Sequence, residues 1–217
     1  MRKRISRILF TGGVAALVVG LAATSSSAIT LVTWNVAPGG TITLAGGKAT
    51  FKDSTTDFAT LHCQSSSGGG SLKTGHDLSG KDLGSIKTLT FMTCTGPTGT
   101  AYTITASLSI PWTLNATAYN SITGVTTMPI EGFRATFSSA GCSGTLNGTS
   151  AASGDGVVKA RYTNATGELR VLAGGATLKL VHDTTGCSSL FQVGDAFTFA
   201  TTFTMSPVQT ITGTKVP

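Results

Sequence analysis

Histidines and carboxylates are the residues of this chain whose side chains can move protons or hold metal ions. The 217 residues include three histidines and nine aspartates and glutamates. Two histidines directly precede an aspartate, in His76-Asp77 and His182-Asp183. Neighbouring residues of a strand point to opposite faces, so neither pair is placed to act as one unit. The sequence has no Gly-x-Ser-x-Gly elbow, no CxxC or CxxH spacing and no calcium-loop spacing. It therefore predicts no catalytic residue, no metal site and no cofactor.

Three residues are predicted to contact a ligand. Glu131 precedes Gly132 at a point where the alternation of a strand changes phase. A β-bulge produces such a change and often re-aims the side chains beside it. Tyr119 and Tyr162 stand at the ends of alternating strands, next to loops, where an aromatic ring can meet a sugar face. Tyr102 and Trp112 fall on an apolar strand face, so we assign them to the core.

The four cysteines are predicted to form two disulfides. An even number of cysteines behind an export signal indicates oxidation in an extracytoplasmic compartment. Four cysteines allow three pairings, and the sequence alone does not choose among them. Sequential pairing closes one local segment in each half of the chain, so we predict the bridges Cys63–Cys94 and Cys142–Cys187.

The stretch from Tyr102 to Ala118 organises the predicted fold. Its even positions are apolar or small and its odd positions, apart from Pro111, are Thr, Ser or Asn. This period of two predicts strand rather than helix. Seventeen residues are about three times a usual strand, so we predict two strands that share a core face and meet in a kink at Pro111-Trp112.

The rest of the chain also reads as short strands separated by turns. We predict a hairpin of residues 41–44 and 49–52 about Gly46-Gly47, a Ser/Gly loop at 64–70, and a hairpin of 157–163 with 168–173. Phe197, Phe199, Phe203 and Met205 share one face of the last strand. These patterns predict an all-β fold, either an antiparallel β-sandwich or a closed β-barrel with two disulfides.

The N-terminus resembles a cleaved export signal. Residues 1–7 carry four basic side chains, residues 8–23 are apolar, and Ser26 and Ala28 occupy the −3 and −1 positions of a small-residue cleavage site. We therefore predict a signal peptide at residues 1–28 and a single β domain at 29–217. The apolar run is short for a membrane span, so we expect no transmembrane anchor after cleavage and a secreted or cell-surface location.

Charge gives no reason to expect nucleic acid as a partner. Fifteen Lys and Arg residues, less the four in the signal, leave eleven against nine acidic residues. Only 11% of the chain is charged, far below the usual quarter, and Thr, Ser and Gly are abundant. Such a surface is rich in hydroxyls and weakly charged.

The sequence resembles a family of uncharacterised exported β-rich proteins from actinobacteria. The resemblance lies in the run from Pro111 to Thr117, in Tyr119 and Ser121, in Thr123-Gly124-Val125-Thr126-Thr127, in Thr93-Cys94-Thr95-Gly96-Pro97, and in Gly141-Cys142, Gly186-Cys187 and Ser206-Pro207. It implies export and a β-rich fold. It brings no activity and no functional residues.

These observations favour a secreted, non-catalytic protein of the extracellular space or cell envelope that acts as a binding module. The sequence does not identify the partner; a cell-surface glycan and a small apolar ligand are the two candidates. Two alternatives stay open: a β-barrel that carries a small apolar or lipid-like ligand, and an extracellular hydrolase with dispersed carboxylates. A cavity inside the fold, or its absence, separates the first alternative from the others.

Overall fold

The computed structural model describes residues 32–56, 59–149, 155–184, 186–187 and 190–215. The predicted signal peptide and its cleavage site lie outside these residues. The regular secondary structure of the described residues consists of strands and one short 3-10 helix, which confirms the all-β prediction. The elements are β1 (Val32–Ala37), β2 (Gly40–Gly46), β3 (Ala49–Asp53), β4 (Thr60–Leu72), β5 (Gly75–Leu78), β6 (Gly84–Thr95), η1 (Pro97–Gly99), β7 (Ala101–Ala106), β8 (Trp112–Leu114), β9 (Ala118–Asn120), β10 (Val125–Thr127), β11 (Ile130–Phe133), β12 (Ala135–Ser139), β13 (Cys142–Asn147), β14 (Gly156–Val158), β15 (Ala160–Thr163), β16 (Glu168–Val171), β17 (Leu178–Thr184), β18 (Ala196–Ser206) and β19 (Thr210–Lys215).

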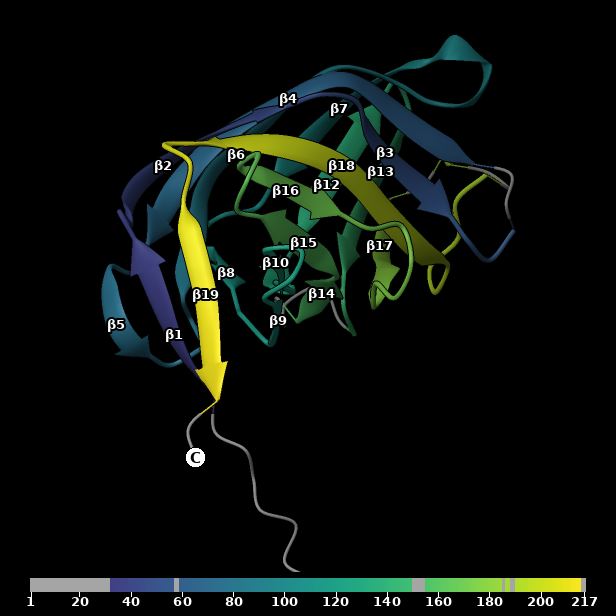
Figure 1. Ribbon diagram of the computed structural model, residues 1–217. Coiled ribbons are helices and arrows are strands. Elements are labelled where there is room, and N and C mark those ends of the chain that lie inside the picture. The colour runs from purple at the N-terminus through teal and green to yellow at the C-terminus, as the bar shows by residue number, and fades with distance from the viewer. Residues whose placement is uncertain (1–31, 57–58, 150–154, 185, 188–189, 216–217) are drawn as a thin grey trace, which may run out of the picture.

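Eight strands of the larger sheet pair in a closed ring, and every pair is antiparallel. β3 pairs with β4, β4 with β6, β6 with β7, β7 with β12, β12 with β13, β13 with β17, β17 with β18, and β18 with β3 again. The larger sheet is therefore a closed β-barrel. Figure 1 shows the long strands β4, β6 and β18 arching together over one side of it.

The remaining strands extend the ring from the same long strands. β18 also pairs with β16, which leads through β15 and β10 to β9. β6 also pairs with β8, which leads through β11 to β14. A separate sheet of β19, β1 and β5 lies together at one edge of the molecule (Figure 1).

Large side chains fill the interior of the barrel. Phe51 stacks on Phe199 with ring centroids 4.6 Å apart, and Trp112 stacks on Phe133 at 4.3 Å. Phe91 meets Phe51 edge to face at 5.2 Å. These rings come from five strands, and the contacts of Phe133 with Phe51 and Phe199 tie the barrel to the strands β8 and β11 that extend it.

The predicted hairpin about Gly46-Gly47 is wrong. β2 and β3 run in the same direction along β4 and β18, and so form one strand interrupted at Gly47 and Lys48. The glycine at position 46 serves close packing rather than a turn, because a Cβ there would overlap Ser66 Oγ and the ring of Phe203.

The predicted Ser/Gly loop at 64–70 is also wrong, because these residues form the middle of β4. β2 and β6 approach β4 closely from its two sides. A Cβ at Gly68 would overlap the carbonyl oxygen of Thr88, and one at Gly70 would overlap that of Ser85. Glycine is used here because a neighbouring backbone comes so near.

The long alternating stretch is divided as expected, and the second strand begins at the predicted position, Trp112, but the break is longer than a kink. β7 ends at Ala106, so the segment 107–111 lies outside the strands, with one backbone hydrogen bond from the Ser107 N–H to the Arg134 carbonyl oxygen. Ile104, Trp112 and Leu114 are buried, whereas Ile110 is 59% exposed. The predicted change of phase at Gly132 is confirmed by a register shift between Glu131 and Phe133.

Candidate functional site

The four cysteines form the predicted bridges, Cys63–Cys94 and Cys142–Cys187. Cys63 and Cys94 stand directly opposite each other on β4 and β6. Cys142 begins β13, and Cys187 lies beyond the end of β17, the strand that pairs with β13. Each bridge therefore fastens a wall of the barrel, and none of these sulfurs is a free thiol.

Tyr162, predicted to contact a ligand, is fully buried. Its hydroxyl donates a hydrogen bond to the carbonyl oxygen of Gln209 at 2.9 Å and accepts one from the Gln209 backbone N–H at 2.7 Å. Burial raises the pKa of this hydroxyl, and its hydrogen bond with Gln209 acts in the opposite direction. The Tyr162 side chain therefore holds the backbone just before β19 in place, and it offers no surface to a ligand.

Tyr119 lies at the seam between the barrel and the small sheet. On β9 it stands opposite Thr126, which is buried, so its ring is on the inner side of the sheet. Gly213 of β19 leaves space for it: a Cβ there would lie 3.1 Å from the Tyr119 Cβ. Tyr119 is half-buried beside a hollow of about 210 Å³ whose rim includes Val32 and Lys215.

Glu131 is exposed and lines a groove of about 420 Å³ together with Ile110, Thr113 and Asp155. Asp155 accepts hydrogen bonds from the backbone N–H of Thr149, at 2.8 Å, and from the Thr149 hydroxyl. One carboxylate of this groove is therefore engaged by Thr149. The carboxylate of Glu131 has no hydrogen-bond partner among the described residues.

The histidines are placed apart from one another. The Nδ1 atom of His62 lies 3.4 Å from the Thr50 hydroxyl on the surface of the barrel. His76 is on β5 and His182 is on β17, on separate sheets. No group of three His, Cys, Asp or Glu side chains suited to a metal ion occurs within the described residues.

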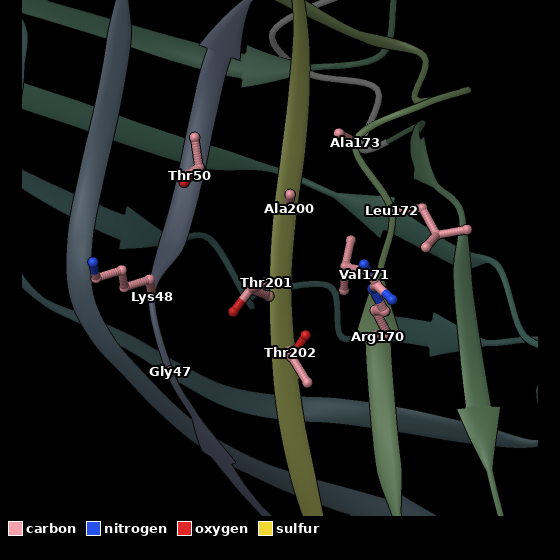
Figure 2. Close-up of a pocket in the computed structure, with 10 residues that line it drawn as sticks. All are labelled: Gly47, Lys48, Thr50, Arg170, Val171, Leu172, Ala173, Ala200, Thr201 and Thr202. Carbon is pink, nitrogen blue, oxygen red and sulfur yellow. The ribbon is translucent and has the colours of Figure 1, made fainter.

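A groove crosses the outside of β18, where neighbouring strands are interrupted on both sides (Figure 2). On one side the β2–β3 strand breaks at Gly47 and Lys48, and on the other side β16 ends at Val171. We call this hollow of about 450 Å³ the β18 groove. It is lined by Gly47, Lys48, Thr50, Arg170, Val171, Leu172, Ala173, Ala200, Thr201 and Thr202.

Lys48 and Arg170 lie on opposite sides of β18 in the β18 groove (Figure 2). Thr202 lies between them on β18 and stands opposite Arg170 in the register of β16 and β18. The Lys48 side chain points away from β18 in this view (Figure 2). Both cations and the Thr202 hydroxyl are exposed.

A second groove of the same volume, about 450 Å³, lies on β9, β10 and β15, and we call it the β10 groove. It is lined by Ala118, Tyr119, Asn120, Thr123, Val125, Thr127 and Arg161. Because Tyr119 faces the inner side, the side chains on the outer face of the groove are those of Ala118, Asn120, Val125, Thr127 and Arg161. Amide, hydroxyl and guanidinium groups thus line this groove.

The two grooves meet at a pair of arginines. Arg161 on β15 stands directly opposite Arg170 on β16, and both side chains are exposed. We call these two residues the arginine pair. Among the described residues no carboxylate lies within ion-pair distance of either arginine. The nearest one by register is Glu168, which lies two residues before Arg170 on the same face.

The arginine pair was not predicted from the sequence, although the sequence contains a signal for it. The hairpin predicted from residues 157–163 and 168–173 pairs Thr163 with Glu168, and that register places position 161 opposite position 170. Reading the cross-strand partners of that hairpin finds the two arginines. The β18 groove gives no such signal, because it depends on where distant strands are interrupted.

Comparison of the chain with protein-family models, with curated proteins and with solved structures gives no match. Within the described residues, no helix has the length and apolar character needed to span a bilayer.

Proposed function

We propose that this chain is an exported, non-catalytic protein of the extracellular space or cell envelope that binds a cell-surface glycan on the outer face of its barrel. The observation that carries the proposal is the contrast between the two sides of the barrel wall. The inner side is packed with Phe51, Phe133, Phe199 and Trp112. The outer side has two open grooves lined by hydroxyl, amide and guanidinium groups.

The packed interior supports surface binding over carriage of a lipid-like ligand. A carrier needs an apolar space of a few hundred Å³ in which the ligand is enclosed. Here the Phe51 ring lies between 4.6 and 6.4 Å from three other aromatic rings at the centre of the barrel. The grooves that do have such volumes open to solvent and carry polar side chains.

The arrangement of titratable groups supports binding over hydrolysis. Retaining and inverting glycosidases each need two carboxylates free to act on the same bond. In the groove beside Glu131, the second carboxylate is that of Asp155, which is engaged by the backbone and hydroxyl of Thr149. Sugar hydroxyls, in contrast, match the hydroxyl and amide groups of the outer grooves.

Export is the part of the proposal that rests on the N-terminal sequence and on the family resemblance. The two disulfides are what an oxidising compartment permits. N-terminal sequencing of protein recovered from culture medium should begin at Ile29. Recovery of the uncleaved chain in the membrane fraction alone would count against export.

Sedimentation with purified, protein-free cell-wall polysaccharide from an actinobacterium tests the binding function. We expect the protein to sediment with the polysaccharide, to release no reducing sugar from it, and to leave a fluorescent fatty acid unbound. Bound fatty acid would favour the carrier, and released sugar would favour the hydrolase. Protein that stays in the supernatant would refute the proposal.

A further inference from the structure

We infer that the β18 groove and the β10 groove form one track that binds a linear anionic polysaccharide across the strands, with the arginine pair at its centre. The inference rests on the proposed function and names the class of ligand. Its first support is continuity. Thr202, Arg170, Arg161 and Thr127 are successive cross-strand partners on β18, β16, β15 and β10.

The continuity sets the direction and the length of the track. Directly opposed residues of antiparallel strands share a face, so these four side chains form a row perpendicular to the strands. Neighbouring strands are about 4.8 Å apart, so the row spans roughly 14 Å between its two threonines. The two grooves extend this row at both ends, to Lys48 beyond β18 and to Asn120 on β9.

The charge along the track points to an anion. Like charges directly opposite each other on a sheet repel and destabilise it. In a chain with so few charged residues, Arg161 and Arg170 nevertheless occupy opposing positions. Lys159 adds a third exposed cation two residues before Arg161, and Glu168 is the carboxylate that partly offsets them. An anionic group between the two guanidinium groups removes their repulsion and accepts their hydrogen bonds.

The other side chains of the track favour a polysaccharide over a nucleic acid. Proteins that hold single-stranded nucleic acids stack bases on exposed aromatic rings. The outer side chains of both grooves include no aromatic ring, since Tyr119 faces inward. They include the hydroxyls of Thr127 and Thr202, which match the hydroxyls of a sugar chain. The amide nitrogen of Asn120 is a further donor, while its Oδ1 already accepts the backbone N–H groups of Ile122 and Thr123.

Binding of short polygalacturonate fragments by the purified protein, measured by isothermal titration calorimetry, tests the inference. The carboxylates of this polymer serve as the anionic groups. We expect the wild-type protein to bind it and to bind neutral dextran and a single-stranded DNA of matched charge far more weakly. The variant Arg161→Gln/Arg170→Gln should lose about tenfold in affinity for each arginine. A matched control, Lys81→Gln/Lys87→Gln, removes the same charge from exposed positions at and before β6 and should leave the affinity unchanged.

Thermal unfolding of the same variants separates lost binding from lost folding. Because the arginine pair is repulsive, its replacement should leave the unfolding midpoint unchanged or raise it. A further variant, Arg170→Glu, places opposite charges across β15 and β16 and should raise the midpoint while abolishing binding. Dextran or DNA bound as tightly as polygalacturonate would overturn the inference, and so would an affinity that the double variant does not lower. Absence of polygalacturonate binding would overturn it as well, while the proposed function would still be decided by wall sedimentation.

Discussion

The hydroxyl of Tyr162 and the backbone of Gln209 form two hydrogen bonds with each other, although the residues lie 47 positions apart in sequence. Tyr162 belongs to β15, and Gln209 directly precedes β19, so the pair joins the barrel to the small sheet. Both residues are fully buried. The Gln209 side chain also accepts a hydrogen bond from the backbone N–H of Gly39, at 2.8 Å, which extends the junction to the start of β2.

Replacement of this hydroxyl should destabilise the protein. Tyr162→Phe leaves the backbone N–H of Gln209 buried without a partner, and an unsatisfied buried group costs about 1–3 kcal/mol. The free energy of unfolding in urea measures this loss. Tyr102→Phe is the matched control, because among the described residues the Tyr102 hydroxyl reaches only the sulfur of Cys142, at 3.9 Å. Equal losses in the two variants would contradict the structural role of the Tyr162 hydroxyl.

The same hydroxyl should make stability fall at alkaline pH. Burial raises the pKa of Tyr162 above its ordinary value of 10.0, so the folded chain holds this proton more tightly than the unfolded chain does. The contribution is fully present below the pKa of the unfolded state and is lost as the pH rises through that of the folded state. Urea unfolding of the wild type and of Tyr162→Phe at neutral and alkaline pH isolates the contribution of this hydroxyl to the free energy of unfolding. A difference between the two proteins that does not shrink with rising pH would contradict it.

The strands that alternate cleanly were predictable from sequence. Phe197, Phe199, Phe203 and Met205 are buried on one face of β18, as their spacing indicates. The disulfide pairing and the bulge beside Gly132 were also predicted correctly. In each case the information is local, because strand period and sequence separation are read from one stretch of chain.

The errors arose where a neighbouring strand decides the local structure. A run of Ser and Gly reads as a loop unless close approach of two other backbones is known, as it is at Gly68 in β4. Ile110 fits the apolar phase of its stretch, yet it is exposed because the chain leaves the ladder at 107–111. Tyr162 is at a strand end next to a loop, but β19 covers it. The β18 groove depends on breaks in strands that are distant in sequence.

The two disulfides should each stabilise the protein. They close segments with sequence separations of 31 and 45 residues, which corresponds to about 3–4 kcal/mol each in the chain-entropy model. Mass spectrometry without reductant should find all four cysteines oxidised. The variant Cys63→Ala/Cys94→Ala should lower the free energy of unfolding by about that amount. A free thiol in the folded protein would contradict the pairing.

Truncation at two positions of the stretch from Tyr102 to Ala118 should cost very different amounts of stability. Trp112 is 1% exposed and stacks on Phe133, so Trp112→Ala should cost about 3–5 kcal/mol. Ile110 is 59% exposed, so Ile110→Ala should change stability by less than about 0.5 kcal/mol. Urea unfolding measures both. A nearly neutral Trp112→Ala variant would contradict the filled interior and favour the carrier.

Backbone amide chemical shifts during a titration with polygalacturonate fragments test the central claim most directly, because they locate the ligand on the protein. Binding on the outer track predicts that the largest changes occur at Thr127, Arg161, Arg170 and Thr202, with little change on β1 and β5. Saturable changes centred instead on Glu131 or on the hollow beside Tyr119 and Lys215, or changes spread through the aromatic interior, would contradict it.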